Sequence, residues 1–77
     1  MNNKAKKINP GDRIFARVTQ NGRTILNFMT DQVSNINELI AILIKKMTQF
    51  RGLVVLHIRN YHQGWGDEQP LFIKSNY

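Results

Sequence analysis

Two runs that alternate between apolar and polar residues, Arg13–Thr19 and Arg23–Thr30, flank the dipeptide Asn21-Gly22. Asn-Gly is the favoured pair for a two-residue type I′ turn, because both turn residues need a positive φ. Alternation on either side of such a turn is typical of two antiparallel strands. The pattern therefore predicts a β-hairpin.

The register of this hairpin decides which side chains share a face of the sheet. A regular two-residue turn places Phe15 opposite Phe28 and Ile14 opposite Met29. A slip of one residue would exchange the two faces of the second strand. We therefore expect Phe28 beside Phe15 on one face, and Met29 with Ile14 on the other.

Apolar residues at spacings of three and four predict a helix from about Ile36 to Phe50. Asn35, followed three residues later by Glu38, has the pattern of a capping box at the start of this helix. Gly52 stands where a left-handed residue often ends a helix.

The remainder of the chain predicts two more strands. Leu53–Tyr61 is rich in β-branched and aromatic residues, which favour a strand. A polar loop over residues 62–69 then leads to Pro70 and a short last strand, Leu71–Lys74. The order β-β-α-β-β predicts an α+β fold of two layers, an antiparallel β-sheet with one helix on one face.

Residues 1–9 carry three lysines and few apolar groups, so we expect them to form a flexible basic arm. Residues 10–77 then make a single α+β domain. Trp65, between Gly64 and Gly66, is either a lid on the core or a recognition finger on a loop. The lid is favoured, because acidic residues follow Trp65 closely and would repel phosphate.

The helix is expected to cover the aliphatic face of the sheet, because the reverse choice would bury Arg13 and Arg17 without partners. The covered face would then hold Ile14, Ala16, Val18, Ile25, Met29, Val54, Leu56 and Ile58. The open face would show Arg13, Phe15, Arg17, Leu26, Phe28, Val55, His57, Arg59 and Tyr61.

The composition excludes several classes of protein. The 77 residues are 42% hydrophobic, which is ordinary for a globular chain. The absence of cysteine excludes disulfides, zinc knuckles and thiol nucleophiles. The longest apolar run, Leu39–Ile44, is too short to span a membrane, and the basic N-terminus lacks the apolar stretch of a secretion signal. We therefore expect a cytoplasmic protein.

A formal charge of +6 favours anionic partners. Aromatic rings interleaved with guanidinium groups on an open sheet are suited to stacking unpaired bases while holding phosphates. The expected function is therefore non-catalytic binding of nucleic acid, RNA or DNA, with single strands favoured. The candidate site residues are Arg13, Phe15, Arg17, Arg23, Phe28, His57, Arg59 and Tyr61.

The same face also fits a protein-interaction or assembly module. Phe15 opposite Phe28 would be a favourable cross-strand pair that needs no ligand. A 77-residue domain has a thin core, and a homodimer or another protein partner would add burial. The two functions are compatible, since a dimer could present one continuous groove.

Catalytic chemistry has little support in the sequence. The five acidic residues show no pairing that would hold a metal or divide acid and base roles. A nuclease using His57, Arg59 and Tyr61 would lack a second oriented base. We expect no enzyme activity, cofactor, metal or small-molecule substrate.

Overall fold

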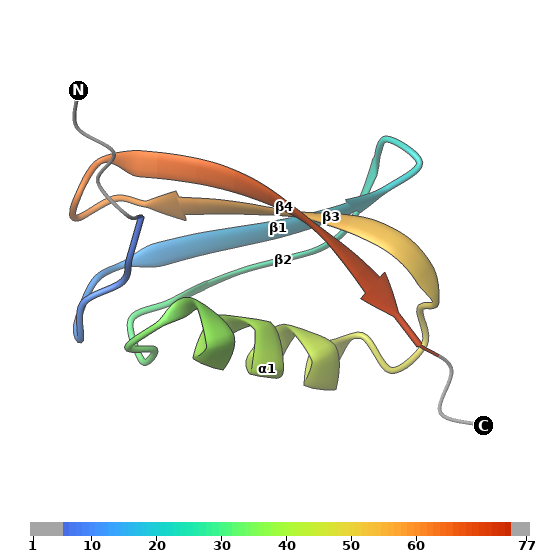
Figure 1. Ribbon diagram of the computed structural model, residues 1–77, viewed down its shortest axis with the longest axis horizontal. Helices are drawn as coiled ribbons and strands as arrows, with labels where there is room; N and C mark the ends of the chain where they lie inside the picture. Colours follow the sequence, from blue (N-terminus) through green and yellow to red (C-terminus); the bar gives the residue numbers. More distant parts are fainter. Residues whose placement is uncertain (1–5, 75–77) are drawn as a thin grey trace.

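The computed structural model describes residues 6–74. Their elements are β1 (Ile14–Gln20), β2 (Arg23–Thr30), α1 (Ile36–Lys46), β3 (Gly52–Asn60) and β4 (Trp65–Ile73). The four strands form one antiparallel sheet in the order β2-β1-β3-β4, and α1 lies along one face of it (Figure 1). The predicted α+β fold is confirmed.

The core lies between α1 and the aliphatic face of the two central strands. The sheet contributes buried Ile14, Ala16, Val18, Val54, Leu56 and Ile58, and the helix contributes Leu39, Leu43 and Met47. Val33, in the connection between β2 and α1, is buried as well and was not expected there. Each fully buried aliphatic side chain of this size contributes about 1.5–3 kcal/mol to stability.

The predicted register of the β1–β2 hairpin is wrong beyond its tip. Thr19 pairs with Thr24, but a β-bulge follows, so that Ala16 pairs with Phe28 and Phe15 with Met29. Phe28 therefore lies on the helix-covered face, while Met29 lies on the open face and is 53% exposed.

The physical reason is burial of apolar side chains. In the regular register Asn27 would lie opposite Ala16 beneath the helix, where an amide without partners is costly. The bulge instead lets Ile25, Leu26 and Phe28 pack against the core. Leu26, like Phe28, was expected on the open face and is not there, since it pairs with buried Val18.

The predicted start of α1 is confirmed and its predicted end is wrong. The Oδ1 atom of Asn35 accepts a hydrogen bond from the amide of Glu38 at 2.9 Å, and Glu38 Oε1 accepts from the Ser34 amide. The helix ends at Lys46 rather than Phe50, because the chain turns at Met47 to enter β3. Gly52 has the expected positive φ of 93°, but it begins β3.

The fourth strand is longer than the sequence predicts. The polar stretch expected as a loop over residues 62–69 begins instead with a tight turn that ends at Gly64, whose φ is 79°. From Trp65 onward the chain pairs with β3, and Pro70 lies opposite Val55. Polar side chains are tolerated in β4 because it is an edge strand with an exposed face.

Residues 6–9, the described part of the predicted arm, pack against the domain. Ile8 is buried in the core, and the carbonyl of Lys7 accepts hydrogen bonds from Gln63 Nε2 at 3.0 Å and from Trp65 Nε1 at 3.2 Å. Trp65 packs on the core as a lid. Residues 1–5 of the predicted arm lie outside the described residues.

Asp12 fixes this segment to the β3–β4 turn. Its Oδ2 atom accepts hydrogen bonds from Asn60 Nδ2 at 2.9 Å, from the Asn9 amide at 3.0 Å and from Gln63 Nε2 at 2.6 Å. These donors, Asn60 foremost, lower the pKa of Asp12 to about 2. Asp12 and Asn60 are both buried, and no local pattern in the sequence predicts that they meet.

Candidate nucleic-acid interface

The open face of the sheet brings together side chains from β1 and β3. Phe15 lies opposite Arg59, and Arg17 lies opposite His57. Side chains directly opposite each other on antiparallel strands have Cβ atoms about 4.5–5.5 Å apart, so these four form one compact group. Tyr61 follows the end of β3, where its amide donates to the carbonyl of Arg13 at 3.0 Å.

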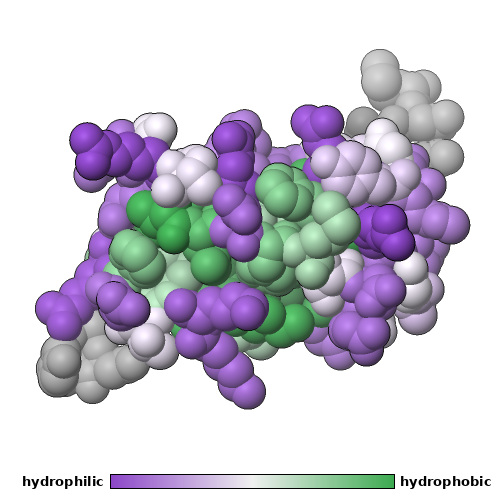
Figure 2. Space-filling view, turned by 180° about the vertical axis from the view of Figure 1, so that it is seen from behind, coloured by the Kyte–Doolittle hydropathy of each residue, from purple (hydrophilic) through white to green (hydrophobic). Residues whose placement is uncertain are grey.

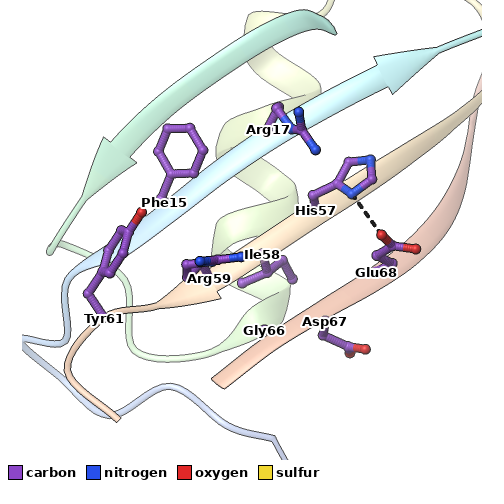
Figure 3. A pocket seen from close by; sticks show the side chains of 9 residues that line it. All are labelled: Phe15, Arg17, His57, Ile58, Arg59, Tyr61, Gly66, Asp67 and Glu68. Atoms are coloured by element: carbon purple, nitrogen blue, oxygen red, sulfur yellow. Dashed lines mark hydrogen bonds and ion pairs between the residues drawn. The ribbon is translucent and has the colours of Figure 1, made fainter. Parts of the chain in front are cut away.

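A shallow hollow opens over this group. Its lining includes Phe15, Arg17, His57, Arg59, Tyr61, Asp67 and Glu68 (Figure 3). The rings of Phe15 and Tyr61 lie at one end of the hollow, and His57 and Glu68 lie at the other. Gly66 on β4 is opposite Arg59 and also belongs to the lining of the hollow. We call Phe15, Arg17, Arg59 and Tyr61 the arginine–aromatic cluster.

Neither arginine of the cluster forms an ion pair within residues 6–74. The close contacts between side chains that can carry opposite charges join Lys6 to Asp67 and His57 to Glu68, and neither involves Arg17 or Arg59. Both arginines are exposed on the sheet surface. Guanidinium groups with unused N–H donors are suited to phosphate oxygens, which they bind through paired hydrogen bonds.

His57 is held in place from both sides of its ring. Its Nε2 atom lies 3.0 Å from Thr19 Oγ1, and its Nδ1 atom lies 3.1 Å from Glu68 Oε2. The sequence did not predict that Glu68 would contact His57, because β4 was expected to begin only after Pro70. Both ring nitrogens are engaged, so His57 forms a fixed wall of the hollow.

The structure brings five of the eight predicted site residues into the hollow: Phe15, Arg17, His57, Arg59 and Tyr61. Arg13 borders a neighbouring depression that it shares with Tyr61 and Asp31. Arg23 lies at the tip of the hairpin, away from the hollow. Phe28 is on the opposite face, where the Nζ atom of Lys46 lies 5.4 Å from the centre of its ring.

The other end of the open face is apolar. Leu53 and Phe72 pair across β3 and β4 and are 62% and 69% exposed. Val55, which the sequence placed on this face, lies next to them opposite Pro70. Neither Leu53 nor Phe72 was predicted on this face. Leu53 follows from the alternation of β3, whereas the face of Phe72 depends on the register of β4.

Comparison of the chain with protein-family models, with curated proteins and with solved structures finds no match. Among residues 6–74, no helix is long and apolar enough to cross a membrane. No group of three or more His, Asp and Glu side chains in the same part of the chain is arranged to hold a metal ion. The geometry of the open face is therefore the basis for a functional proposal.

Proposed function

We propose that the protein binds single-stranded nucleic acid, without catalysis, on the open face of its sheet. One observation carries this proposal: two arginines without ion-pair partners among residues 6–74 lie beside two aromatic rings in one hollow. Tyr61, 54% exposed, and the half-buried Phe15 stack on bases, while Arg17 and Arg59 neutralise phosphates. A cytoplasmic location is part of this proposal.

Single strands fit this surface better than duplexes. Stacking on Phe15 and Tyr61 requires bases whose faces are free, and a duplex keeps its bases stacked on each other. Base–aromatic stacking contributes about 1–3 kcal/mol per base and tolerates many sequences. The net charge of +6 adds attraction that does not depend on sequence.

The test is the salt dependence of binding. Fluorescence anisotropy of labelled single-stranded and duplex oligonucleotides is measured at several salt concentrations between about 50 and 200 mM. Wild-type protein should prefer the single strand. The double variant Arg17→Ala, Arg59→Ala should bind more weakly, and the slope of log K against log salt should fall by about 1.4, or 0.7 for each lost phosphate contact.

A matched control removes the same charge from the other side of the molecule. Lys45→Ala with Lys46→Ala also deletes two cations, but these belong to α1. This pair should change affinity and slope much less than the arginine pair does. Equal losses in the two double variants would mean that the protein attracts nucleic acid only through its net charge.

A protein-interaction module is the second candidate, and the exposed pair Leu53 and Phe72 favours it. Apolar side chains that touch each other on a surface often mark a protein interface. Phe72→Lys separates the two functions. It should leave nucleic-acid affinity unreduced, whereas it would abolish binding to a protein partner seated on this end of the face.

A further inference from the structure

The two edges of the sheet differ in their capacity to pair with another strand. On β4, Pro70 lacks an amide hydrogen, and Asp67 and Glu68 carry charge. Proline and charged residues are devices that protect edge strands from further pairing. On β2, the segment Thr24–Thr30 contains neither proline nor charge. The β2 edge is therefore open to pairing, and the β4 edge is protected.

Apolar side chains lie beside the unpaired β2 edge. Ile25, Leu26 and Phe28 are only partly buried on the helix side of β2. On α1, Lys46 lies over Phe28, and partly buried Ile42 is one helical turn before Lys46 on the same side. Figure 2, seen from behind, shows apolar side chains gathered in the middle of this side with hydrophilic ones around them. We call Ile25, Leu26, Phe28 and Ile42 the β2 patch.

We propose that β2 pairs antiparallel with β2 of a second copy of this chain. The pairing joins the two four-stranded sheets into one continuous sheet with both helices on the same side. It satisfies the outward-facing backbone groups of β2, and it covers the β2 patch of each copy with that of the other. The proposal does not depend on the nucleic-acid function.

The charges at the two ends of β2 select the antiparallel direction. Arg23 begins the strand and Asp31 follows its last residue, so the strand is basic at one end and acidic at the other. Antiparallel pairing brings Arg23 near Asp31 of the partner subunit at both ends. Parallel pairing would place like charges together, which is destabilising.

The faces and the end charges of β2 together select the register. Only a two-fold axis at Asn27 places Arg23 directly opposite Asp31 of the partner subunit. Residues directly opposite each other in a sheet share a face, and Leu26 and Phe28 both lie on the helix-covered face. A two-fold axis at Asn27 places Leu26 opposite Phe28 of the partner subunit. It also places Asn27 opposite Asn27 of the partner subunit, on the face away from the helices.

The first measurement is the mass of the full chain by sedimentation across a range of concentrations. The proposal predicts twice the monomer mass of 9.0 kDa. Met29→Lys places charge on the open edge and should weaken the dimer about tenfold, which is about 1.4 kcal/mol. Its control is Ile44→Lys, a change at a residue of similar exposure (51% against 53%) on α1, which should leave the dimer intact.

Cysteine cross-linking tests the register, because the chain has no cysteine of its own. Opposite residues of antiparallel strands have Cα atoms about 4.5–5.5 Å apart, within the range that a disulfide spans. Asn27→Cys should therefore form a covalent dimer under mild oxidation. Phe72→Cys, on the apolar end of the open face, should not.

Three outcomes would overturn the proposal. A monomer at every concentration shows that β2 does not pair with itself. A dimer that is linked through Phe72→Cys but not through Asn27→Cys shows that the sheets meet face to face. If the protein is a monomer, and its β2 amides are protected from hydrogen exchange only after a foreign peptide is added, the β2 edge binds another protein.

Discussion

The two faces of the sheet belong to the same four strands, yet they carry different kinds of side chain. On β3, alternate residues Val54, Leu56 and Ile58 are buried under the helix, while His57 and Arg59, on either side of Ile58, point to the open side. The covered face is aliphatic and closely packed, so it supplies stability. The open face combines charge, aromatic rings and a hollow, which are properties of a binding surface rather than of a core.

The largest expected effect compares two leucines of β3 that lie on opposite faces. Leu56 is fully buried and Leu53 is 62% exposed. Leu56→Ala should lower the free energy of unfolding by about 2–5 kcal/mol, because it removes buried methyl groups and leaves a cavity. Leu53→Ala should change it by less than about 0.5 kcal/mol. Urea denaturation of both variants measures the contrast, and equal losses would show that Leu53 is covered in solution.

The next effect concerns the aromatic residues of the two faces. Phe15→Ala and Tyr61→Ala should each weaken single-strand binding by about 1–3 kcal/mol, because each removes a stacking surface. Phe28→Leu should leave the affinity unchanged, since Phe28 lies beneath Lys46 on the covered face. Anisotropy titrations at one salt concentration compare the three variants. Weaker binding by Phe28→Leu, with the fold intact by circular dichroism, would contradict the assignment of the faces.

These phenylalanines also show what the sequence could predict. The hairpin, the helix start and the order β-β-α-β-β follow from local signals: Asn21-Gly22, the Asn35 cap and residue periodicity. The bulge at Val18 has no local signal, because it results from packing of Ile25 and Leu26 against a core that distant parts of the chain build. One extra residue was enough to move Phe28 from the predicted site to the opposite face.

The candidate site likewise contains residues that local sequence signals predict and residues that they do not. Arg17, Arg59 and Phe15 were predicted correctly on the open face, because alternation along β1 and β3 is regular. Glu68 and Gly66 were missed as parts of the hollow. Their contribution depends on the register of β4, an edge strand whose polar residues give no strand pattern. Long-range pairing, rather than local propensity, completes the site.

Asp12 lies before β1, outside both faces of the sheet, and its ionisation makes the stability of the protein depend on pH. Its pKa of about 2 in the folded protein is below the ordinary value of 3.8, so folding favours the ionised carboxylate. The stabilisation is therefore fully present above about pH 4 and is lost as the pH falls towards 2. Asp12→Asn should be less stable at neutral pH and should lose less stability over this range. Urea midpoints measured from pH 2 to 7 test this.

Asp31→Asn also removes one negative charge, but from an exposed residue. Its comparison with Asp12→Asn, at concentrations at which both are monomeric, separates the hydrogen bonds of Asp12 from the simple loss of a charge. If Asp12→Asn and the wild type lose stability in parallel between pH 4 and 2, the hydrogen bonds to Asp12 do not contribute to acid unfolding.

The smallest effect separates two neighbouring acidic residues of β4. Glu68 lines the hollow, where its side chain is 72% exposed and contacts His57. Asp67 also lines the hollow, but it pairs with Ile58 and its charge is balanced in part by an ion pair with Lys6 at 3.7 Å. Bound phosphate is therefore repelled mainly by Glu68, whose charge faces the site of the two arginines.

Glu68→Gln should tighten single-strand binding up to about fivefold, because exposed charge interactions are worth about 0.2–1 kcal/mol. The gain should shrink as salt is raised, since screening weakens the repulsion that the substitution removes. Stability should stay within about 0.5 kcal/mol of the wild type, because glutamine keeps an oxygen that can accept from His57. Asp67→Asn should change affinity less. Equal gains from both substitutions would mean that the Lys6 ion pair does not reduce the repulsion from Asp67, and no gain from either would mean that nucleic acid does not occupy the hollow.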